Sequence, residues 1–222
     1  MNSQKGMSLL EIMVVTAIFA AMTIVINNVI FSAQVMWSGG SSYSSLESEC
    51  LKITKQISAD LEMSAVMQVP TGVGLSYTDR LPHVEISGGD DTDGYYGDSI
   101  TFLTPGFRSN GEPIVLFTST ELSVDWTQGS VITYSTIPTT GGSNILRRTV
   151  TNLVTGAVTS KDLTTNLESI RFRDKDSDVD IASYYVVKYD MTLKKKGIAG
   201  RFYSIIRSGY VYLRNSRGAE DL

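Results

Sequence analysis

The pattern of hydrophobic and polar positions divides the chain into an apolar rod and a remainder with short, strand-like runs. No Asp, Glu, Lys or Arg occurs in residues 12–46. Residues 7–26 are apolar with four interruptions, at Ser8, Glu11, Thr16 and Thr23. About 20 apolar residues in a row are the length that a helix needs to cross a bilayer. We therefore predict a transmembrane helix over residues 7–30.

The helical pattern continues beyond this span with a single apolar stripe. Apolar residues recur at steps of three and four, at Leu46, Cys50, Ile53, Ile57 and Leu61. We assign the polar residues to the other faces, namely Glu47, Lys52, Lys55, Gln56, Asp60 and Glu62. This spacing is typical of an amphipathic helix that packs on a domain. The prediction is one helix over residues 7–68, of which residues 43–67 pack on a head.

Two features limit this helix. No Pro occurs before Pro70, which is a plausible stop. Gly39 and Gly40 stand in the middle of the helix, and each Gly costs about 1 kcal/mol relative to Ala. We predict a bend there, or a stretch that melts on assembly.

Residues 71–222 have the texture of an antiparallel sheet. Short β-prone runs alternate with Gly, Asp, Asn and Pro, and the predicted strands are 100–103, 114–117, 131–134, 145–148, 170–172, 185–193 and 202–213. In 185–193 the residues at odd-numbered positions are apolar, and the charged residues stand at even-numbered positions. This alternation, with a period of two residues, is typical of a half-buried strand. Gly209 suggests a bulge in the last strand. The predicted fold is α+β, with one N-terminal helix on an antiparallel sheet in a single head, residues 71–222.

The residues before the apolar run form a short basic leader that ends in Gly. The sequence is Lys5-Gly6-Met7-Ser8-Leu9-Leu10-Glu11. It resembles the class III signal of the type IV pilin superfamily, which includes pilins, minor pilins and the pseudopilins of type II secretion. The resemblance implies that residues 1–6 are a leader and that prepilin peptidase cuts between Gly6 and Met7 and N-methylates Met7. The family usually has Phe at this position, so Met7 is a departure.

Glu11 is costly at the start of an apolar run, because a carboxylate that enters a bilayer needs a partner charge. After cleavage the α-amine of Met7 is a cation four residues back, within one helical turn. The amine of a neighbouring subunit could serve equally and would bring two subunits into axial register. In the pilin family this pairing is the role of the Glu. The alternative is a polar residue near a membrane end that snorkels to the headgroups.

Other targeting signals fit less well. An ordinary secretory signal has an apolar core of about 7–15 residues and then a small-x-small cleavage site. Here the apolar core is longer, and Ser38-Gly39-Gly40 is only a weak candidate site. Lys5 and the N-terminus are the positive charges before the helix, which favours the leader inside the cell and the head in the periplasm.

A second resemblance extends over most of the chain. Its pieces are residues 57–61, the Leu146-Arg147-Arg148 strand, residues 163–172 before an acidic turn, and residues 202–215. Together they are similar to the PilW/GspJ group of minor pilins and pseudopilins. This implies a minor subunit at or near the tip of a filament. The implied partners are other minor pilins or pseudopilins, the major subunit, the inner membrane and its assembly platform.

Composition excludes several classes of protein. The net charge of −4 argues against a dedicated nucleic-acid binder, so no nucleic-acid partner is expected. One Cys allows no internal disulfide, and one His leaves no His-rich or Cys-rich metal site. No Gly-x-Ser-x-Gly or phosphate-binding Gly loop occurs, and no nucleophile–base arrangement is suggested. We therefore predict that the protein is a substrate of a peptidase rather than an enzyme, and we expect no cofactor.

An acidic cluster raises the question of calcium. Its carboxylates alternate at Asp174, Asp176, Asp178 and Asp180. Oxygen ligands at positions 1, 3, 5 and 7 begin a calcium loop, but the sixth position is Val179 and the twelfth is Tyr185, where such a loop has Gly and Glu. A calcium site and a solvated hairpin turn both remain open, and the turn is favoured.

A basic cluster, Lys194-Lys195-Lys196 with Arg201, is predicted at a hairpin end. It is either a charged turn between two strands, which we favour, or a patch for DNA uptake. Two functions other than a filament subunit therefore stay open. One is a surface-binding module, a tip adhesin or DNA receptor. The other is a membrane-anchored periplasmic domain that never assembles.

Overall fold

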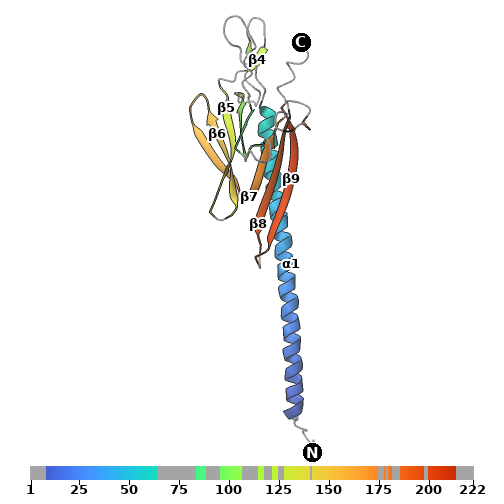
Figure 1. Ribbon diagram of the computed structural model, residues 1–222. Helices are drawn as coiled ribbons and strands as arrows, with labels where there is room; N and C mark the ends of the chain where they lie inside the picture. The colour runs from blue at the N-terminus through green and yellow to red at the C-terminus, as the bar shows by residue number, and fades with distance from the viewer. Residues whose placement is uncertain are drawn as a thin grey trace, which may run out of the picture.

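The computed structural model describes residues 9–64, 84–88, 96–106, 115–117, 122–124, 128–140, 142–174, 178, 180–181, 186–197 and 200–213. One helix, α1 (Leu9–Met63), carries a head of strands at its C-terminal half (Figure 1). The strands are β1 (Val84–Ser87), β2 (Ser99–Thr104), β3 (Val115–Phe117), β4 (Leu122–Val124), β5 (Ser130–Ile137), β6 (Asn144–Asn152), β7 (Val158–Arg173), β8 (Val186–Lys196) and β9 (Phe202–Tyr212). The predicted α+β class is confirmed.

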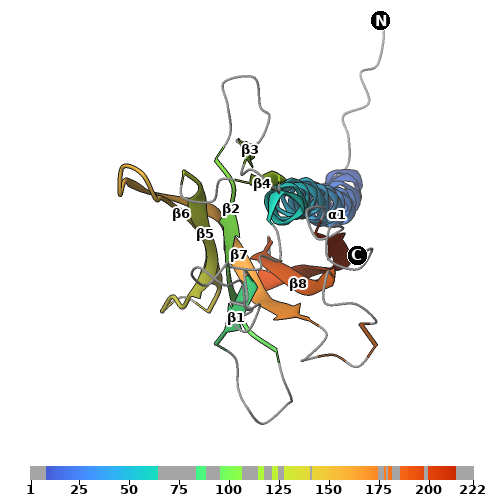
Figure 2. The same cartoon turned by 90° about the horizontal axis from the view of Figure 1, so that it is seen from above.

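The sheet is antiparallel and curls around its own core. Its seven strands follow the order β1-β2-β5-β6-β7-β8-β9, and β3 and β4 form a separate hairpin. The long strand β7 pairs with β6 along its first half and with β8 along its second. Two hydrogen bonds between Gly97 and Phe172, of 3.1 and 2.8 Å, join the segment just before β2 to the end of β7. Seen from above, α1 lies beside β8 and β9, while the ribbons of β5 and β6 lie farther from it (Figure 2).

The apolar stripe of α1 is the part that meets the sheet. All five predicted stripe residues are buried, with exposed fractions between 0 and 3%: Leu46, Cys50, Ile53, Ile57 and Leu61. They pack in one cluster with residues from β2, β5, β6, β7, β8 and β9, including Phe102, Tyr189 and Met191. The stripe prediction is confirmed, and Cys50 lies within the stripe as a free, buried cysteine. Burial of this stripe is what joins helix and head.

The helix differs from its sequence pattern in two places. Asp60, which the pattern assigns to a polar face, is 2% exposed, so that assignment is wrong. It follows Ile57 by three residues and therefore shares the face of the stripe. The helix also runs without interruption through Gly39 and Gly40, where the sequence predicts a bend.

The strand predictions hold for seven of the nine strands of the described residues, and β1 and β4 were not predicted. β7 begins twelve residues earlier than expected, at Val158. Its first residues, 158–162, are all exposed and give no alternation of polar and apolar side chains. The predicted bulge at Gly209 is wrong, since the β8–β9 register runs through it unbroken. Gly209 is needed there because a Cβ would lie 2.4 Å from the Tyr189 hydroxyl oxygen.

Candidate functional site

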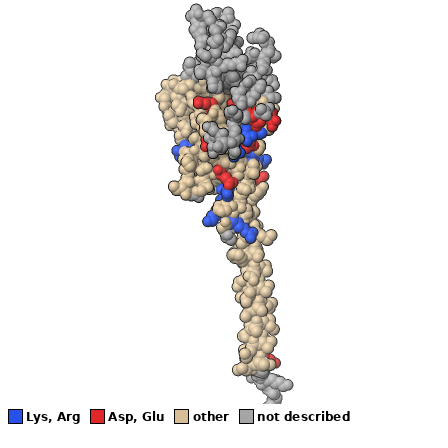
Figure 3. All heavy atoms as spheres, in the orientation of Figure 1, with Lys and Arg blue, Asp and Glu red and all other residues tan. Residues whose placement is uncertain are grey.

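The N-terminal half of α1 is an apolar shaft without cover from the head. Residues 9–34 are all exposed, and the helix is long and apolar enough to cross a membrane. In Figure 3 the shaft is free of charged side chains except at its lower end. Within it, the Thr16 hydroxyl donates to the Met13 carbonyl at 3.0 Å, and Thr23 donates to Phe19 at 2.8 Å. These bonds satisfy the hydroxyls inside the helix, as a lipid environment requires.

Glu11 lies in the first turn of α1 with its side chain exposed. A carboxylate at this end of a helix is favoured by the helix dipole, which is positive there. The predicted cleavage and methylation residues, Gly6 and Met7, lie outside the described residues. The pairing of Glu11 with the Met7 amine therefore stays a prediction.

A half-buried aromatic ring fixes the lower end of the head against α1. Tyr203 of β9 lies between Gly39 of the helix and Gly197 after β8. A Cβ on Gly39 would lie 2.7 Å from the Tyr203 hydroxyl oxygen, and a Cβ on Gly197 would lie 2.4 Å from the ring. Nearby, the Lys195 ammonium donates to the Ser45 hydroxyl at 3.4 Å. The glycine that weakens the helix is thus the place where the head closes on it.

A buried ion pair fixes the upper end of the head. The Arg148 guanidinium of β6 donates twice to the Asp60 carboxylate of α1, at 2.5 and 3.1 Å. The Tyr134 hydroxyl of β5 donates to the same carboxylate at 2.5 Å, and the Gln56 amide donates at 3.1 Å. Four donors therefore compensate a carboxylate whose side chain is 3% exposed, as a buried charge requires.

The contacts in this cluster raise the pKa of both Arg148 and Tyr134, which keeps the two groups in the protonated forms that donate to Asp60. Hydrogen bonding to Asp60 raises the pKa of Arg148, so the guanidinium stays charged. Burial, and then the negative charge of Asp60, raise the pKa of Tyr134, so the phenol stays neutral and donates. Sequence reasoning noted Asp60 and Arg148 separately and missed their contact. The available signal was a pair of opposite charges at positions that should face the core. Asp60 lies on the apolar face of the helix, and Arg148 lies on the same side of its strand as Leu146 and Val150.

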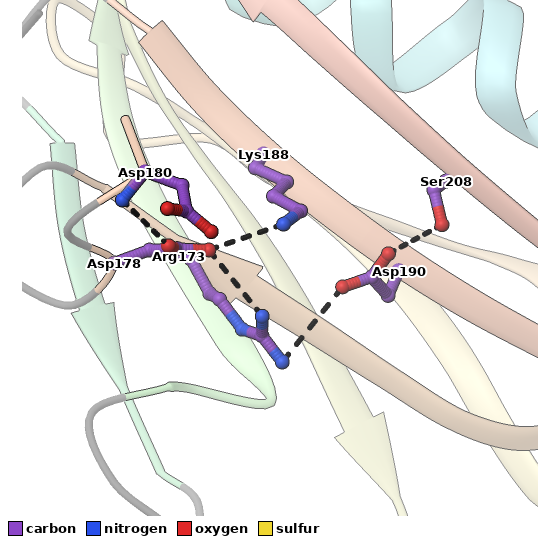
Figure 4. A network of polar contacts seen from close by, with 6 residues as sticks. All are labelled: Arg173, Asp178, Asp180, Lys188, Asp190 and Ser208. Atoms are coloured by element: carbon purple, nitrogen blue, oxygen red, sulfur yellow. Dashed lines mark hydrogen bonds and ion pairs between the residues drawn. The ribbon is translucent and has the colours of Figure 1, made fainter. Parts of the chain in front are cut away.

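The acidic cluster forms an ion-pair network on the outer face of the sheet (Figure 4). The Asp178 carboxylate accepts from Lys188 at 3.1 Å, from Arg173 at 3.3 Å and from the Asp180 backbone N–H at 3.1 Å. Asp190 lies 3.9 Å from Arg173 and accepts from Ser208. The Asp180 N–H, and then Lys188, lower the pKa of Asp178.

This network bears on the calcium prediction. Two cations already engage Asp178, and Asp176 lies outside the described residues. No group of three His, Cys, Asp or Glu able to hold a metal occurs within the described parts of the chain. A calcium site at Asp174, Asp176, Asp178 and Asp180 stays an untested prediction.

A polar cleft of about 500 Å³ opens beside the β2–β7 junction. Its lining is Tyr96, Asp98, Thr136, Asn144, Glu168, Ser169, Ile170 and Arg171. The Arg171 guanidinium lies 4.4 Å above the Tyr96 ring, and Glu168 forms a 2.6 Å ion pair with Lys194. Among these lining residues there is no His or Cys to serve as a base or a nucleophile.

The comparisons with known proteins identify the N-terminal segment. Residues 1–27 match the family model described as Prokaryotic N-terminal methylation motif. Neither the search of curated proteins nor the search of solved structures gives a match. The matched span contains the predicted leader, the predicted cleavage residues, Glu11 and residues 9–27 of the exposed part of α1. The chain therefore carries a type IV pilin-like prepilin signal at the start of a helix that bears a β-rich head.

Proposed function

We propose that this protein is a minor structural subunit of a type II secretion pseudopilus or a type IV pilus, at or near the tip of the filament. Prepilin peptidase cuts it after Gly6 and methylates Met7, and the assembly platform then extracts it from the inner membrane. Its partners are the major subunit and other minor pilins or pseudopilins. It has no enzymatic activity of its own.

One observation carries this proposal. The prepilin motif lies in register with a continuous helix whose first half is exposed and uncharged beyond Glu11, while the second half buries one face under the head. An apolar rod of this kind needs lipid or other rods around it. Lateral packing with the helices of neighbouring subunits can replace lipid, and Glu11 then supplies the contact that sets axial register.

Substitution of Glu11 tests assembly directly. We expect Glu11→Gln to reduce incorporation into filaments by about tenfold or more, because the neutral amide cannot replace a buried charge pair. Incorporation is measured by immunoblotting of sheared filaments against the membrane pool. Thr16→Val is the matched control, because it removes a polar group whose bond stays within the helix, and it should incorporate normally. Normal incorporation of Glu11→Gln would favour the anchored domain that never assembles.

The two filament systems share all of this chemistry and need a separate test. A deletion strain is assayed for secretion and for twitching motility. Loss of secretion assigns the subunit to a pseudopilus, in which it resembles the J-type pseudopilin. Loss of motility assigns it to a type IV pilus as a minor pilin that primes assembly.

A further inference from the structure

The lower end of the head carries a cluster of positive charge that the proposed function does not use. Its members lie at the end of the β8–β9 hairpin: Lys194, Lys195, Lys196 and Arg201. Residues 194–201 contain no Asp or Glu, so this segment carries a charge of +4. Because the net charge of the whole chain is −4, the remaining residues carry −8. Lys196 and Arg201 are exposed, and Lys194 and Lys195 are half-buried. We call these four residues the basic hairpin end.

The basic hairpin end has a fixed height along α1. Tyr203 packs between Gly39 and Gly197, and the Gly197 N–H donates to the Arg201 carbonyl at 2.7 Å. The lower ends of β8 and β9 are the part of the described head nearest the exposed shaft of α1 (Figure 1). Blue side chains gather at this lower margin of the head in Figure 3. The end of the hairpin therefore stays near the level of Gly39, while the Lys195 ammonium reaches Ser45, about 9 Å further along the helix.

For a helix that enters the bilayer at Glu11, that level corresponds to the opposite surface of the membrane. At 1.5 Å per residue, Glu11 to Trp37 spans about 39 Å, close to the roughly 40–45 Å of a bilayer with its headgroups. Trp37 is 83% exposed and uncharged residues precede it down to Ile12, so it is placed as an interfacial aromatic anchor. Gly39 lies only about 3 Å further along the helix. A head that closes on Gly39 meets the headgroups.

We propose that the basic hairpin end binds the anionic phospholipid headgroups of the membrane that α1 spans, and so holds the head on the bilayer before assembly. This rests on the membrane-inserted state of the proposed subunit. The exposed ring of Phe202 lies beneath the Lys194 ammonium, at 5.2 Å, and adds an apolar group to the same end. Extraction into a filament must break these contacts, so the lipid charge opposes departure from the membrane.

DNA is the rival ligand for such a cluster. The position favours lipid, because the four cations are confined to the end of the head nearest the shaft, next to Trp37 and Phe202. A duplex bound there would have to lie in the space that the bilayer occupies. DNA binding is therefore an outcome of the test below.

The test uses the full-length protein in lipid nanodiscs. Ser204→Cys supplies a labelling site on β9 near the hairpin, and the native Cys50 is fully buried and is not labelled. A fluorophore at position 204 reports contact through quenching by lipids with a nitroxide on the headgroup. Discs of phosphatidylcholine are compared with discs that also contain phosphatidylglycerol.

We expect stronger quenching in the anionic discs, and a decrease when salt is added. The variant Lys195→Gln/Lys196→Gln/Arg201→Gln should lose this difference. Each basic side chain at an anionic surface contributes about a fivefold factor, so the ratio of docked to undocked heads falls on the order of 100-fold. Lys194 is kept because it pairs with Glu168. The matched control, Lys52→Gln/Lys55→Gln/Lys161→Gln, removes three exposed cations elsewhere and should behave like the parent.

Three results would overturn the proposal. The first is equal quenching in discs with and without phosphatidylglycerol. The second is a hairpin variant that keeps the difference in quenching between the two lipids. The third is binding of double-stranded DNA that depends on the basic hairpin end, together with no effect of anionic lipid on quenching. Failure of the protein to enter discs at all would instead contradict the membrane-anchored state in the proposed function. The two failures are thus distinguishable.

Discussion

At the scale of residues, two neighbouring arginines illustrate how strongly burial affects the contribution of an ion pair to stability. Arg148 pairs with an Asp60 side chain that is 3% exposed, whereas Arg147 pairs with Asp162 across side chains that are 39 and 41% exposed. Both pairs have similar bond lengths, of 2.5 and 2.6 Å. The environment of the two pairs, and not their geometry, should set their contribution to stability.

Arg148→Ala should lower the free energy of unfolding by roughly 3–5 kcal/mol, because it leaves a buried carboxylate without its cation. Arg147→Ala should cost far less, because solvent already screens that exposed pair. Thermal unfolding of the full-length protein in detergent measures both. Equal losses for the two variants would contradict the role that we assign to the Asp60 cluster.

Asp178 gives a pH dependence at the same scale. Its pKa is lowered in the folded protein, so its pairs stabilise the head above the unfolded pKa, near 4, and this contribution disappears as the pH falls. The melting temperature of the parent should therefore decrease more steeply on acidification below about pH 4 than that of Asp178→Asn. Parallel curves for the two proteins would show that the network contributes nothing.

At the scale of elements, α1 shows what the sequence pattern could predict. The spacing of apolar residues located the buried stripe, because a helix repeats every 3.6 residues whatever it packs against. The contact of Asp60 with Arg148 could not be predicted, because the two residues are 88 positions apart and their meeting depends on the curl of the sheet. The length of β7 was missed for a related reason. Its exposed first residues, 158–162, are held by pairing to β6 and not by burial, which leaves no periodic signal.

The glycine pair within α1 offers a test at this scale. A Cβ on Gly40 would have no neighbouring atom within 4 Å, so Gly40→Ala should raise the free energy of unfolding by about 1 kcal/mol. Gly39→Ala gains the same helix propensity but displaces Tyr203, whose hydroxyl oxygen would lie 2.7 Å from the new carbon. It should therefore be less stable than Gly40→Ala when both are unfolded in detergent. The reverse order would show that Tyr203 does not hold the head on the helix.

At the scale of the whole molecule, the structure joins two parts that require different surroundings. The first half of α1 is exposed and apolar and needs lipid or neighbouring helices, whereas the head has its own core and a charged surface. The Tyr203 contact and the Asp60 cluster fix the head on the helix at two heights. A force on the helix would therefore be transmitted to the head without a hinge between them, which suits a subunit that is lifted out of a membrane as one piece.

The central claim is that this rod is freed at its N-terminus so that it can enter a filament. Mass spectrometry of the native protein, purified from membranes, tests it most directly. The account predicts a mature chain that begins with N-methylated Met7 and lacks residues 1–6. A native chain that keeps its first six residues would contradict it.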